Sequence, residues 1–541
     1  MGTLSFLFDR HITPENLPWH GLPAIYTHIT TNLDEHGVLN EAGQTLPDED
    51  RRFQEGDLRW VAGGIDGAIG HHFRGSSDKK RARHIVPLIQ EIARNDSQAK
   101  KVELYNVLLA DDLVGYFDSL LEAMTQLHLE PEPYLRNFAR WLALEGTDRG
   151  PVKFAIALLG VIGQPKDADV AALLGKHEEF TLYAATAISA LLDEPLPHIW
   201  DLAKHVSGWG RIHLVERLTN TENPEIQQWL IREGYKNDIM YEYLAYICAT
   251  AGDLKSALDQ ETIDEDLLNS AGELLDALII GGPAEDIDDY ADAPVVIRRY
   301  LAHLESMAHR LEHFLSAHLI HAYLTELKEQ WGQRKKQGWT LETRNTLLQT
   351  SQRIMQRPLW QELVRQDLSS DDPTTFYTAS QAAEALGIDT WDAHWEKLRE
   401  QPFDPRHWHE IVRRANEERI MDIVGAAREY LPLDKIATGP EDALGLGEEY
   451  VNHHCLDVIL QGLGQYPETG QFLVEIALLS PVVRNRNMAI RVLSLWGQHR
   501  WTLEIEQLLQ EAFQREPNTE VQERIRRVLD GEPLEGDDEF S

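Results

Sequence analysis

A glycine-rich stretch near the N-terminus holds the side chains best suited to chemistry. Trp60 precedes a glycine cluster at residues 63–70 that contains Asp66, and His71 and His72 follow it directly. Glycines let backbone approach a ligand closely, while the carboxylate, the imidazoles and the indole supply ligands, bases and an apolar wall. The candidate pocket therefore consists of Trp60, Asp66, His71 and His72. The same glycines also suit a tight turn where helices cross, and that structural role stays open.

A second motif lies at the centre of the chain. His309 to His313 spells His-x-x-Glu-His, which some zinc peptidases carry on a helix. If the helix is continuous, at 100° per residue both histidines face away from the apolar residue Leu304. The spacing therefore predicts a solvated helix face and no zinc site.

The remaining motifs are incomplete. Gly175-Lys176-His177 lacks the first glycine and the hydroxyl of a P-loop, and Gly445-x-Gly447 lacks the third glycine of a dinucleotide fingerprint. Cys248 and Cys455 fall within helical runs and are predicted to be small core residues. No cofactor can be assigned from these patterns.

Composition limits the possible partners. The 541 residues include 51 Lys and Arg against 89 Asp and Glu, a net charge of −38. Such a field repels phosphate backbones, which argues against nucleic acid, and it favours a basic partner or simply keeps the chain in solution. Only two cysteines argue against a disulfide framework. With no apolar run near the ~20 residues of a membrane span and no signal peptide, we expect a cytoplasmic protein.

Helical periodicity dominates the chain. Apolar residues recur at spacings of three and four, as at Phe154, Ala157 and Leu158. Near the C-terminus, Pro481 and Val492-Leu493 recur 36 residues later as Pro517 and Val528-Leu529. A repeat of this length is typical of stacked helical hairpins, and proline suits a first helical turn. We predict an all-α fold, a HEAT-like α-solenoid with an irregular N-terminal cap.

The chain is predicted to contain five regions. Proline and glycine break residues 1–78 into short pieces, an atypical unit of the kind that closes the end of a solenoid. The other regions are 79–282, a helical-repeat region; 283–430, a long helix from Pro294 to about Lys328 with connecting helices; 431–531, the C-terminal HEAT-like repeats; and 532–541, an acidic tail.

Part of the sequence resembles a known group of proteins. The blocks that carry the resemblance are Leu17–Tyr26, Leu46–Glu49 and Leu58–Gly64. They resemble bacterial proteins named limonene hydroxylase, and the likeness extends along the chain. The resemblance implies a monooxygenase that inserts oxygen at an allylic carbon of the cyclic monoterpene limonene, giving perillyl alcohol or carveol. It implies no particular catalytic residue.

Two functions follow from these observations. A limonene hydroxylase would bind a small apolar terpene and would need a redox cofactor or metal, with a reduced nicotinamide as electron source, because side chains alone cannot activate oxygen. Its most plausible site is near Asp66, His71 and His72. The alternative is a non-catalytic α-solenoid scaffold that binds another protein on an extended surface, and the net charge favours a basic partner.

Overall fold

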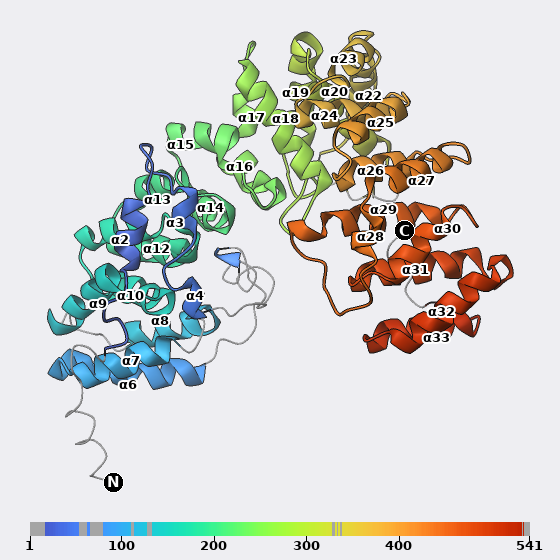
Figure 1. Ribbon diagram of the computed structural model, residues 1–541. Helices are drawn as coiled ribbons and strands as arrows, with labels where there is room; N and C mark the ends of the chain where they lie inside the picture. The colour runs from blue at the N-terminus through green and yellow to red at the C-terminus, as the bar shows by residue number, and fades with distance from the viewer. Residues whose placement is uncertain are drawn as a thin grey trace. The chain divides into compact units, whose positions relative to one another are not determined.

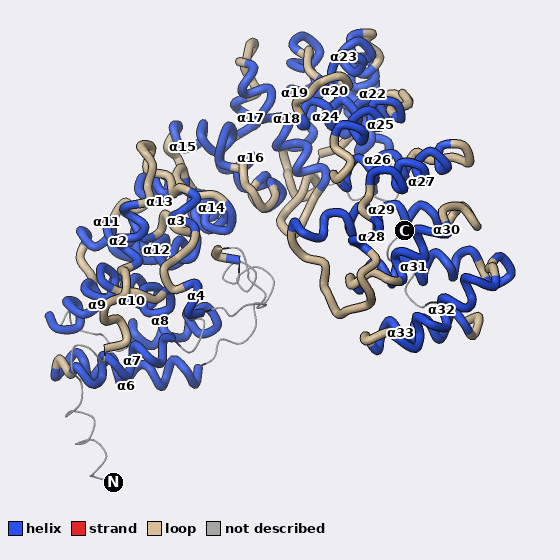
Figure 2. Tube along the Cα trace, viewed as in Figure 1, coloured by secondary structure: helices blue, strands red, loops and turns tan. Residues whose placement is uncertain are grey.

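Helices make up the regular structure of the described chain. The computed structural model describes residues 17–52, 62–64, 79–109, 113–126, 133–326, 331–332, 334–335, 338–532 and 534. Within these ranges every regular element is a helix (Figures 1 and 2), and β pairing is limited to two isolated bridges. The predicted all-α fold is confirmed. The chain divides into two compact units, Met1–Arg357 and Pro358–Ser541, and this boundary falls inside the predicted 283–430 region.

The first unit begins with short helices and continues with longer ones. Its α-helices are α2 (Ile25–Thr31), α3 (Glu41–Gln44), α4 (Glu49–Arg52), α6 (Lys79–Asn95), α7 (Gln98–Leu109), α8 (Phe117–Gln126), α9 (Pro133–Glu145), α10 (Arg149–Ile162), α11 (Ala168–Leu174), α12 (Glu178–Leu191), α13 (Leu196–Ala203), α14 (Gly208–Val215), α15 (Pro224–Trp229), α16 (Ala245–Ala251), α17 (Leu254–Ala257), α18 (Glu265–Ile280), α19 (Ala293–Met307), α20 (Leu311–Thr325) and α22 (Leu341–Met355). Among the helices that the structure describes, none is both long enough and apolar enough to cross a membrane.

Helices two places apart in this unit pack against one another in series. One series runs through α10, α12 and α14, and another through α16, α18, α20 and α22. Stacked helical hairpins require this pattern, because each hairpin presents one helix to the equivalent helix of the next. The packing agrees with the predicted solenoid, and the HEAT-like architecture itself stays a prediction.

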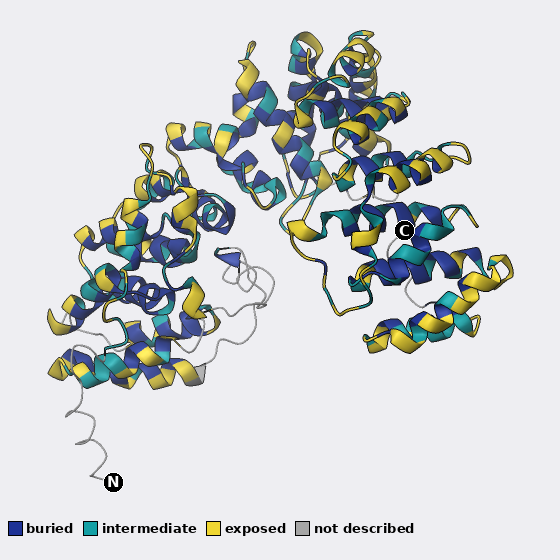
Figure 3. Cartoon of the chain, viewed as in Figure 1, coloured by how far each residue is buried: buried dark blue, intermediate teal, exposed yellow. Residues whose placement is uncertain are grey.

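The centre of the first series is apolar. Helix α10 buries a nearly continuous run from Val152 to Leu159, and α12 buries Phe180, Tyr183 and Ile188 against it. Figure 3 shows these buried stretches in dark blue. Gly160 permits the close approach, since a Cβ there would lie 3.0 Å from the Cα of Ala187. Helices α10 and α12 thus form a packed support for residues 17–52, which we call the N-terminal segment.

The expected long helix from Pro294 to about Lys328 is wrong. The structure ends α19 at Met307 and begins α20 at Leu311, with Ala308 and Arg310 in extended conformation. The apolar spacing is the same on both sides of the break, so periodicity did not show it. The break allows α19 and α20 each to pack along α22, while α20 also packs on α18. Two shorter helices bury more apolar surface than one exposed rod would.

The second unit is also a stack of helices. Its α-helices are α23 (Leu359–Asp367), α24 (Pro373–Ala385), α25 (Trp391–Glu400), α26 (Pro405–Arg413), α27 (Arg419–Tyr430), α28 (Leu433–Ile436), α29 (Val451–Leu463), α30 (Gln471–Leu478), α31 (Val483–Trp496), α32 (Leu503–Arg515) and α33 (Thr519–Leu529). Helices α29, α31 and α33 pack in series, and α30 packs on α32. One hydrophobic core connects them.

The two prolines of the sequence repeat occupy the same place in their turns. Pro481 precedes Val482, the N-cap of α31, and Pro517 precedes Asn518, the N-cap of α33. Both prolines therefore lie one position before the cap, whereas we had expected them in the first helical turn. Proline fixes φ and lacks an N–H, so it also suits this extended approach to a helix. The apolar pairs near the ends of α31 and α33 pack in the core, as expected.

Candidate functional site

The predicted pocket falls in a part of the chain that the structure describes only at its edge. Trp60, Asp66, His71 and His72 lie outside the described residues, so whether they converge stays untested. Residues 62–64 of the same stretch are described and lie against the start of α12. The backbone N–H of Gly63 donates to Glu179 Oε1 at 3.4 Å. Gly63 has φ +68°, and a Cβ there would lie 3.0 Å from the carbonyl oxygen of Glu178, which explains the need for glycine.

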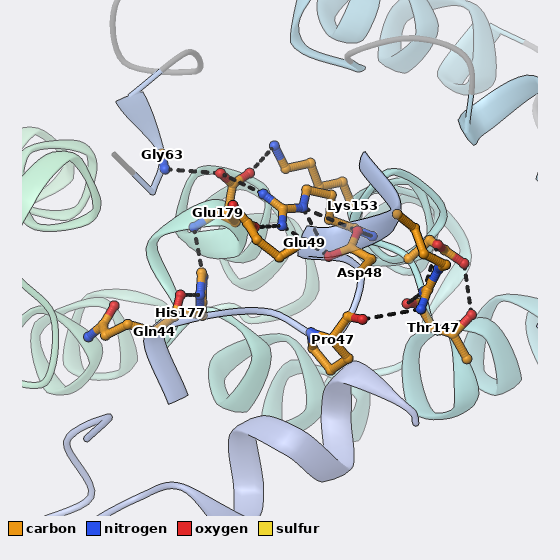
Figure 4. A network of polar contacts seen from close by, with 12 residues as sticks. Gln44, Pro47, Asp48, Glu49, Gly63, Thr147, Lys153, His177 and Glu179 are labelled. Carbon is orange, nitrogen blue, oxygen red and sulfur yellow. Dashed lines mark hydrogen bonds and ion pairs between the residues drawn. The ribbon is translucent and has the colours of Figure 1, made fainter. Parts of the chain in front are cut away.

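Glu179 belongs to a buried charge network, which we define as Asp48, Glu49, Arg149, Lys153 and Glu179 (Figure 4). Arg149 receives its anions from the N-terminal segment: its Nη2 lies 3.0 Å from Asp48 Oδ1, and it also contacts Glu49. Lys153 Nζ lies 2.7 Å from Glu179 Oε2, and Arg149 Nη1 lies 3.6 Å from Glu179 Oε1. Figure 4 shows Glu179 between the Gly63 N–H and the Lys153 ammonium.

Local helix geometry positions the two cations. Arg149 and Lys153 are four residues apart in α10, so both project from one face of that helix. Asp48 also accepts the backbone N–H of Arg149 at 2.8 Å, which satisfies a donor in the first turn of α10. The negative charge of Asp48 thus stabilises the N-terminus of α10, and its carboxylate also pairs with the side chain of Arg149, the first residue of that helix.

The anion is positioned by the cap of α12. His177 is the N-cap, and its Nδ1 accepts the backbone N–H of Glu179 at 3.2 Å. Its Nε2 lies 3.1 Å from the carbonyl oxygen of Gln44 and donates to it, since the other ring nitrogen is already an acceptor. His177 therefore ties α12 to the N-terminal segment through backbone contacts.

A second polar group holds the same segment a few residues further on. Arg51 Nη2 donates to the Thr147 carbonyl at 2.8 Å and to Asp148 Oδ1 at 2.9 Å. The Tyr105 hydroxyl donates to the other oxygen of Asp148 at 2.5 Å. Burial raises the pKa of Tyr105, and the Asp148 carboxylate raises it further, so the phenol stays a donor.

Burial and pairing shift the pKa of three groups at this site. Burial opposes ionisation of Glu179, but Lys153 and Arg149 outweigh it and lower the pKa of Glu179 to about 2. Burial lowers the pKa of His177 to about 4, so this imidazole is neutral at pH 7. Burial also opposes the charge of Arg149, but Asp48 reverses this and raises its pKa. At neutral pH Arg149 and Glu179 are therefore ionised beside one another, and the geometry of the network suits anchoring.

One neighbouring carboxyl behaves differently. Glu178 is half-buried and accepts the backbone N–H of Trp209, at the start of α14, at 3.1 Å. Burial raises the pKa of Glu178 to about 7, although the N–H groups of Gly210 and Trp209 favour the ionised form. Glu178 is therefore the one group beside the described glycines whose protonation changes near neutral pH.

Few features of the sequence indicated this network. Asp48 and Arg149 are 101 residues apart, and no local pattern connects them. A signal existed in α10, where Arg149 and Lys153 interrupt a run that is otherwise apolar through Ile162. Charges four residues apart in a buried helix require partners from another segment.

The His-x-x-Glu-His motif occupies a different environment from the one expected. His313 is buried, and its Nε2 lies 2.8 Å from Asn269 Oδ1. Its Nδ1 accepts the N–H of His309 at 3.3 Å, while the His309 side chain is exposed. The prediction that both histidines face solvent is wrong for His313, because the break between α19 and α20 changes the helical phase. Across the described ranges, no group of three or more His, Cys, Asp or Glu side chains could hold a metal ion.

Both cysteines lie in the core, as predicted. Cys248 and Cys455 are buried free thiols. Burial raises the pKa of Cys248, and it raises the pKa of Cys455 to about 12. Their thiolates are therefore disfavoured as nucleophiles or metal ligands.

An aromatic surface feature lies in the first unit and was not anticipated. Trp19 packs edge-on against Trp141, with ring centroids 4.9 Å apart, and at the same distance from Tyr105. Open hollows of about 600 Å³ and 560 Å³ both have Trp19 and Trp141 in their walls. Leu22 and Pro23 also line the larger hollow.

In comparisons with known proteins, no family model matches the sequence, and no curated protein matches it.

Proposed function

We propose that this protein is a non-catalytic helical scaffold that binds another protein. The observation that supports the proposal is the serial packing of alternate helices, α10 to α14 and α16 to α22 in the first unit and α29 to α33 in the second. Stacks of this kind expose long, repeated surfaces, which helical-repeat proteins use for protein partners. The buried charge network fits the same function, because it anchors the N-terminal segment to the stack.

Charge selects the kind of partner. A net charge of −38 attracts basic surfaces and repels nucleic acid. The scaffold would act in the cytoplasm, where free cysteines such as the two buried here stay reduced.

The scaffold proposal is tested by chemical crosslinking of the full chain in its native cells, followed by purification under physiological salt. We expect one protein to copurify in stoichiometric amount and, in a parallel purification without the crosslinker, to dissociate at high salt. Conversion of limonene to an oxygenated product by the purified chain would overturn the proposal.

A second candidate function is the monoterpene hydroxylase that the resemblance implies. The observation in its favour is the larger hollow, because Trp19, Leu22 and Pro23 belong to a block that carries the resemblance and also line this space. The aromatic and aliphatic part of its wall suits a small apolar terpene, while His20, His28 and Glu145 line the same space.

The hydroxylase also needs an oxygen-activating group supplied with electrons from a reduced nicotinamide. The described residues do not fit a haem thiolate, since burial raises the pKa of both thiols. The ligands predicted from the sequence, Asp66, His71 and His72, lie outside the described residues. We therefore derive no step through such a group.

The test of this second function is elemental analysis with an absorption spectrum on protein purified without chelators. A hydroxylase requires one equivalent of iron or copper, or a flavin or haem band, and loss of that signal in the His71→Ala/His72→Ala variant. A colourless, metal-free protein that leaves limonene unchanged when supplied with reduced nicotinamide would exclude it.

A further inference from the structure

The loop between α28 and α29 presents two leucines to solvent from a fixed backbone. We define residues 439–449 as the docking loop. Leu444 and Leu446 are 75% and 65% exposed, yet Gly445 between them is buried. Gly445 has a left-handed φ of +73°, and its backbone packs inward while the leucine side chains on either side of it are exposed. Exposed leucines are unremarkable singly, but a paired display on an ordered loop indicates binding.

The loop is attached to the helices along its length. Its backbone pairs with the start of α31, where Ala443 accepts the N–H of Val483 at 3.1 Å. Gly439 donates its N–H to the Leu479 carbonyl at 2.8 Å. From α33, the Asn518 side chain donates to Asp442 Oδ1 at 3.0 Å.

Gly445 is the central point of attachment. His454 Nε2 lies 2.7 Å from its carbonyl oxygen, and a Cβ at Gly445 would lie 2.6 Å from Val482 Cγ1. Its φ of +73° also favours glycine. The position is thus fixed from both sides, and the leucines cannot turn inward without breaking these contacts. Pre-organisation of this kind lowers the entropy that binding must offset.

The loop is acidic around the leucines. Four carboxylates, those of Glu441, Asp442, Glu448 and Glu449, are exposed, and the loop contains no Lys or Arg. The neighbouring cation Arg484 directs its Nε to Asp457 Oδ2 at 3.3 Å, on α29. Two apolar anchors with exposed carboxylates on both sides of them in the loop complement an apolar stripe flanked by Lys or Arg.

We propose that the docking loop binds a basic amphipathic helix of a partner protein, with Leu444 and Leu446 as anchors and the carboxylates as the charged rim. This inference rests on the proposed scaffold function and assigns it a surface. The carboxylates steer the approach and make binding sensitive to salt, because exposed charges are screened beyond about 8 Å at physiological ionic strength. The leucines supply an apolar contact, which salt does not screen.

The test measures binding of a fluorescent 18-residue helix of leucine and lysine to the full chain by anisotropy. We expect the Leu444→Ser/Leu446→Ser variant to bind at least tenfold more weakly than the wild type. The matched control, Leu341→Ser/Leu503→Ser, removes leucines that are 67% and 72% exposed elsewhere and should bind within twofold of the wild type. A Glu441→Gln/Glu448→Gln/Glu449→Gln variant should lose most of the salt dependence.

Other outcomes distinguish failure of the docking loop from failure of the proposed scaffold function. Equal binding by the wild type and the Leu444→Ser/Leu446→Ser variant overturns the docking loop, while a crosslinked partner would leave the scaffold function standing. Self-association of the wild type in sedimentation, abolished by the same substitutions without loss of peptide binding, would overturn the proposal in favour of a second copy as occupant. Failure to crosslink any partner, combined with limonene turnover, would remove the scaffold function itself.

Discussion

Arg486 and Glu516 form an ion pair in which each side chain is about 1% exposed, with Arg486 Nη2 2.7 Å from Glu516 Oε1. Glu516 immediately precedes Pro517, in the turn before α33, and Arg486 lies in the first turns of α31. Arg486 also donates to the carbonyls of Ser480 and Pro481 at 2.8 and 2.9 Å. The Arg486 guanidinium thus joins the turn that precedes α31 to the turn that precedes α33.

Removing one partner of this pair should destabilise the second unit strongly. We expect Glu516→Ala to lower its free energy of unfolding by about 3 to 5 kcal/mol, since it leaves the Arg486 charge buried without its anion. Denaturant unfolding measures the effect. Glu523→Ala, which breaks an exposed pair with Arg526, should leave the free energy of unfolding nearly unchanged. Equal costs for the two variants would show that the buried pair does not join the repeats.

The charge network makes a similar prediction in the first unit. Arg149→Met should release the segment 40–52 and cost about 3 kcal/mol, because Asp48 and Glu49 lose the cation that they share. Hydrogen exchange in that segment is the direct readout, with denaturant unfolding beside it. Lys204→Met, which removes a partner of the exposed Asp201, is the control and should leave exchange unchanged. Unchanged protection in Arg149→Met would contradict an anchoring role.

His177 predicts loss of stability in mild acid. Its folded pKa is about 4, against 6.5 for an unperturbed histidine, so the unfolded chain binds a proton first as the pH falls. Stability from this group is complete above about pH 6.5 and is lost as the pH falls towards 4. Denaturant unfolding across this range should show the slope, and His177→Asn should reduce it. His36→Asn changes an exposed histidine and should leave the slope intact.

For Glu178 we predict the opposite pH dependence of the free energy of unfolding. Its folded pKa of about 7 lies above the 4.5 of an unperturbed glutamate, so the folded chain holds a proton that the unfolded chain has lost. Its contribution is complete below about pH 4.5 and is lost as the pH rises to 7. Glu178→Gln keeps an acceptor for the Trp209 N–H and should raise the free energy of unfolding at pH 8 by on the order of 1 kcal/mol. If Glu178→Gln does not raise the free energy of unfolding at pH 8, then the Glu178 carboxyl is more solvated than the structure shows.

The two thiols should be unreactive until the protein unfolds. With Cys455 at a pKa of about 12 and Cys248 also raised by burial, neither forms much thiolate at pH 8. A thiol titration should detect no fast-reacting group in native protein and two after denaturation. A rapid native reaction would show that one cysteine opens to solvent.

Local patterns predicted the helices well because helix faces repeat every few residues. Phe154 and Leu158 lie in the core, as their spacing indicated. The break between Met307 and Leu311 escaped detection because the choice between one helix and two depends on α22, a later segment. The network at Arg149 was missed for the same physical reason, since its anions come from distant segments. The candidate residues Trp60, Asp66, His71 and His72 stay a prediction.

The anchoring of the N-terminal segment also has a consequence for synthesis. A ribosome makes Asp48 first and its partner Arg149 only 101 residues later. At the usual elongation rates of about 5 to 20 residues per second, Asp48 emerges without its cation for roughly 5 to 20 s. Glu179 and the cap of α12 follow later still. The segment 40–52 therefore reaches its final place only after α10 and the start of α12 have been made, and it depends on the nascent chain remaining unaggregated until then.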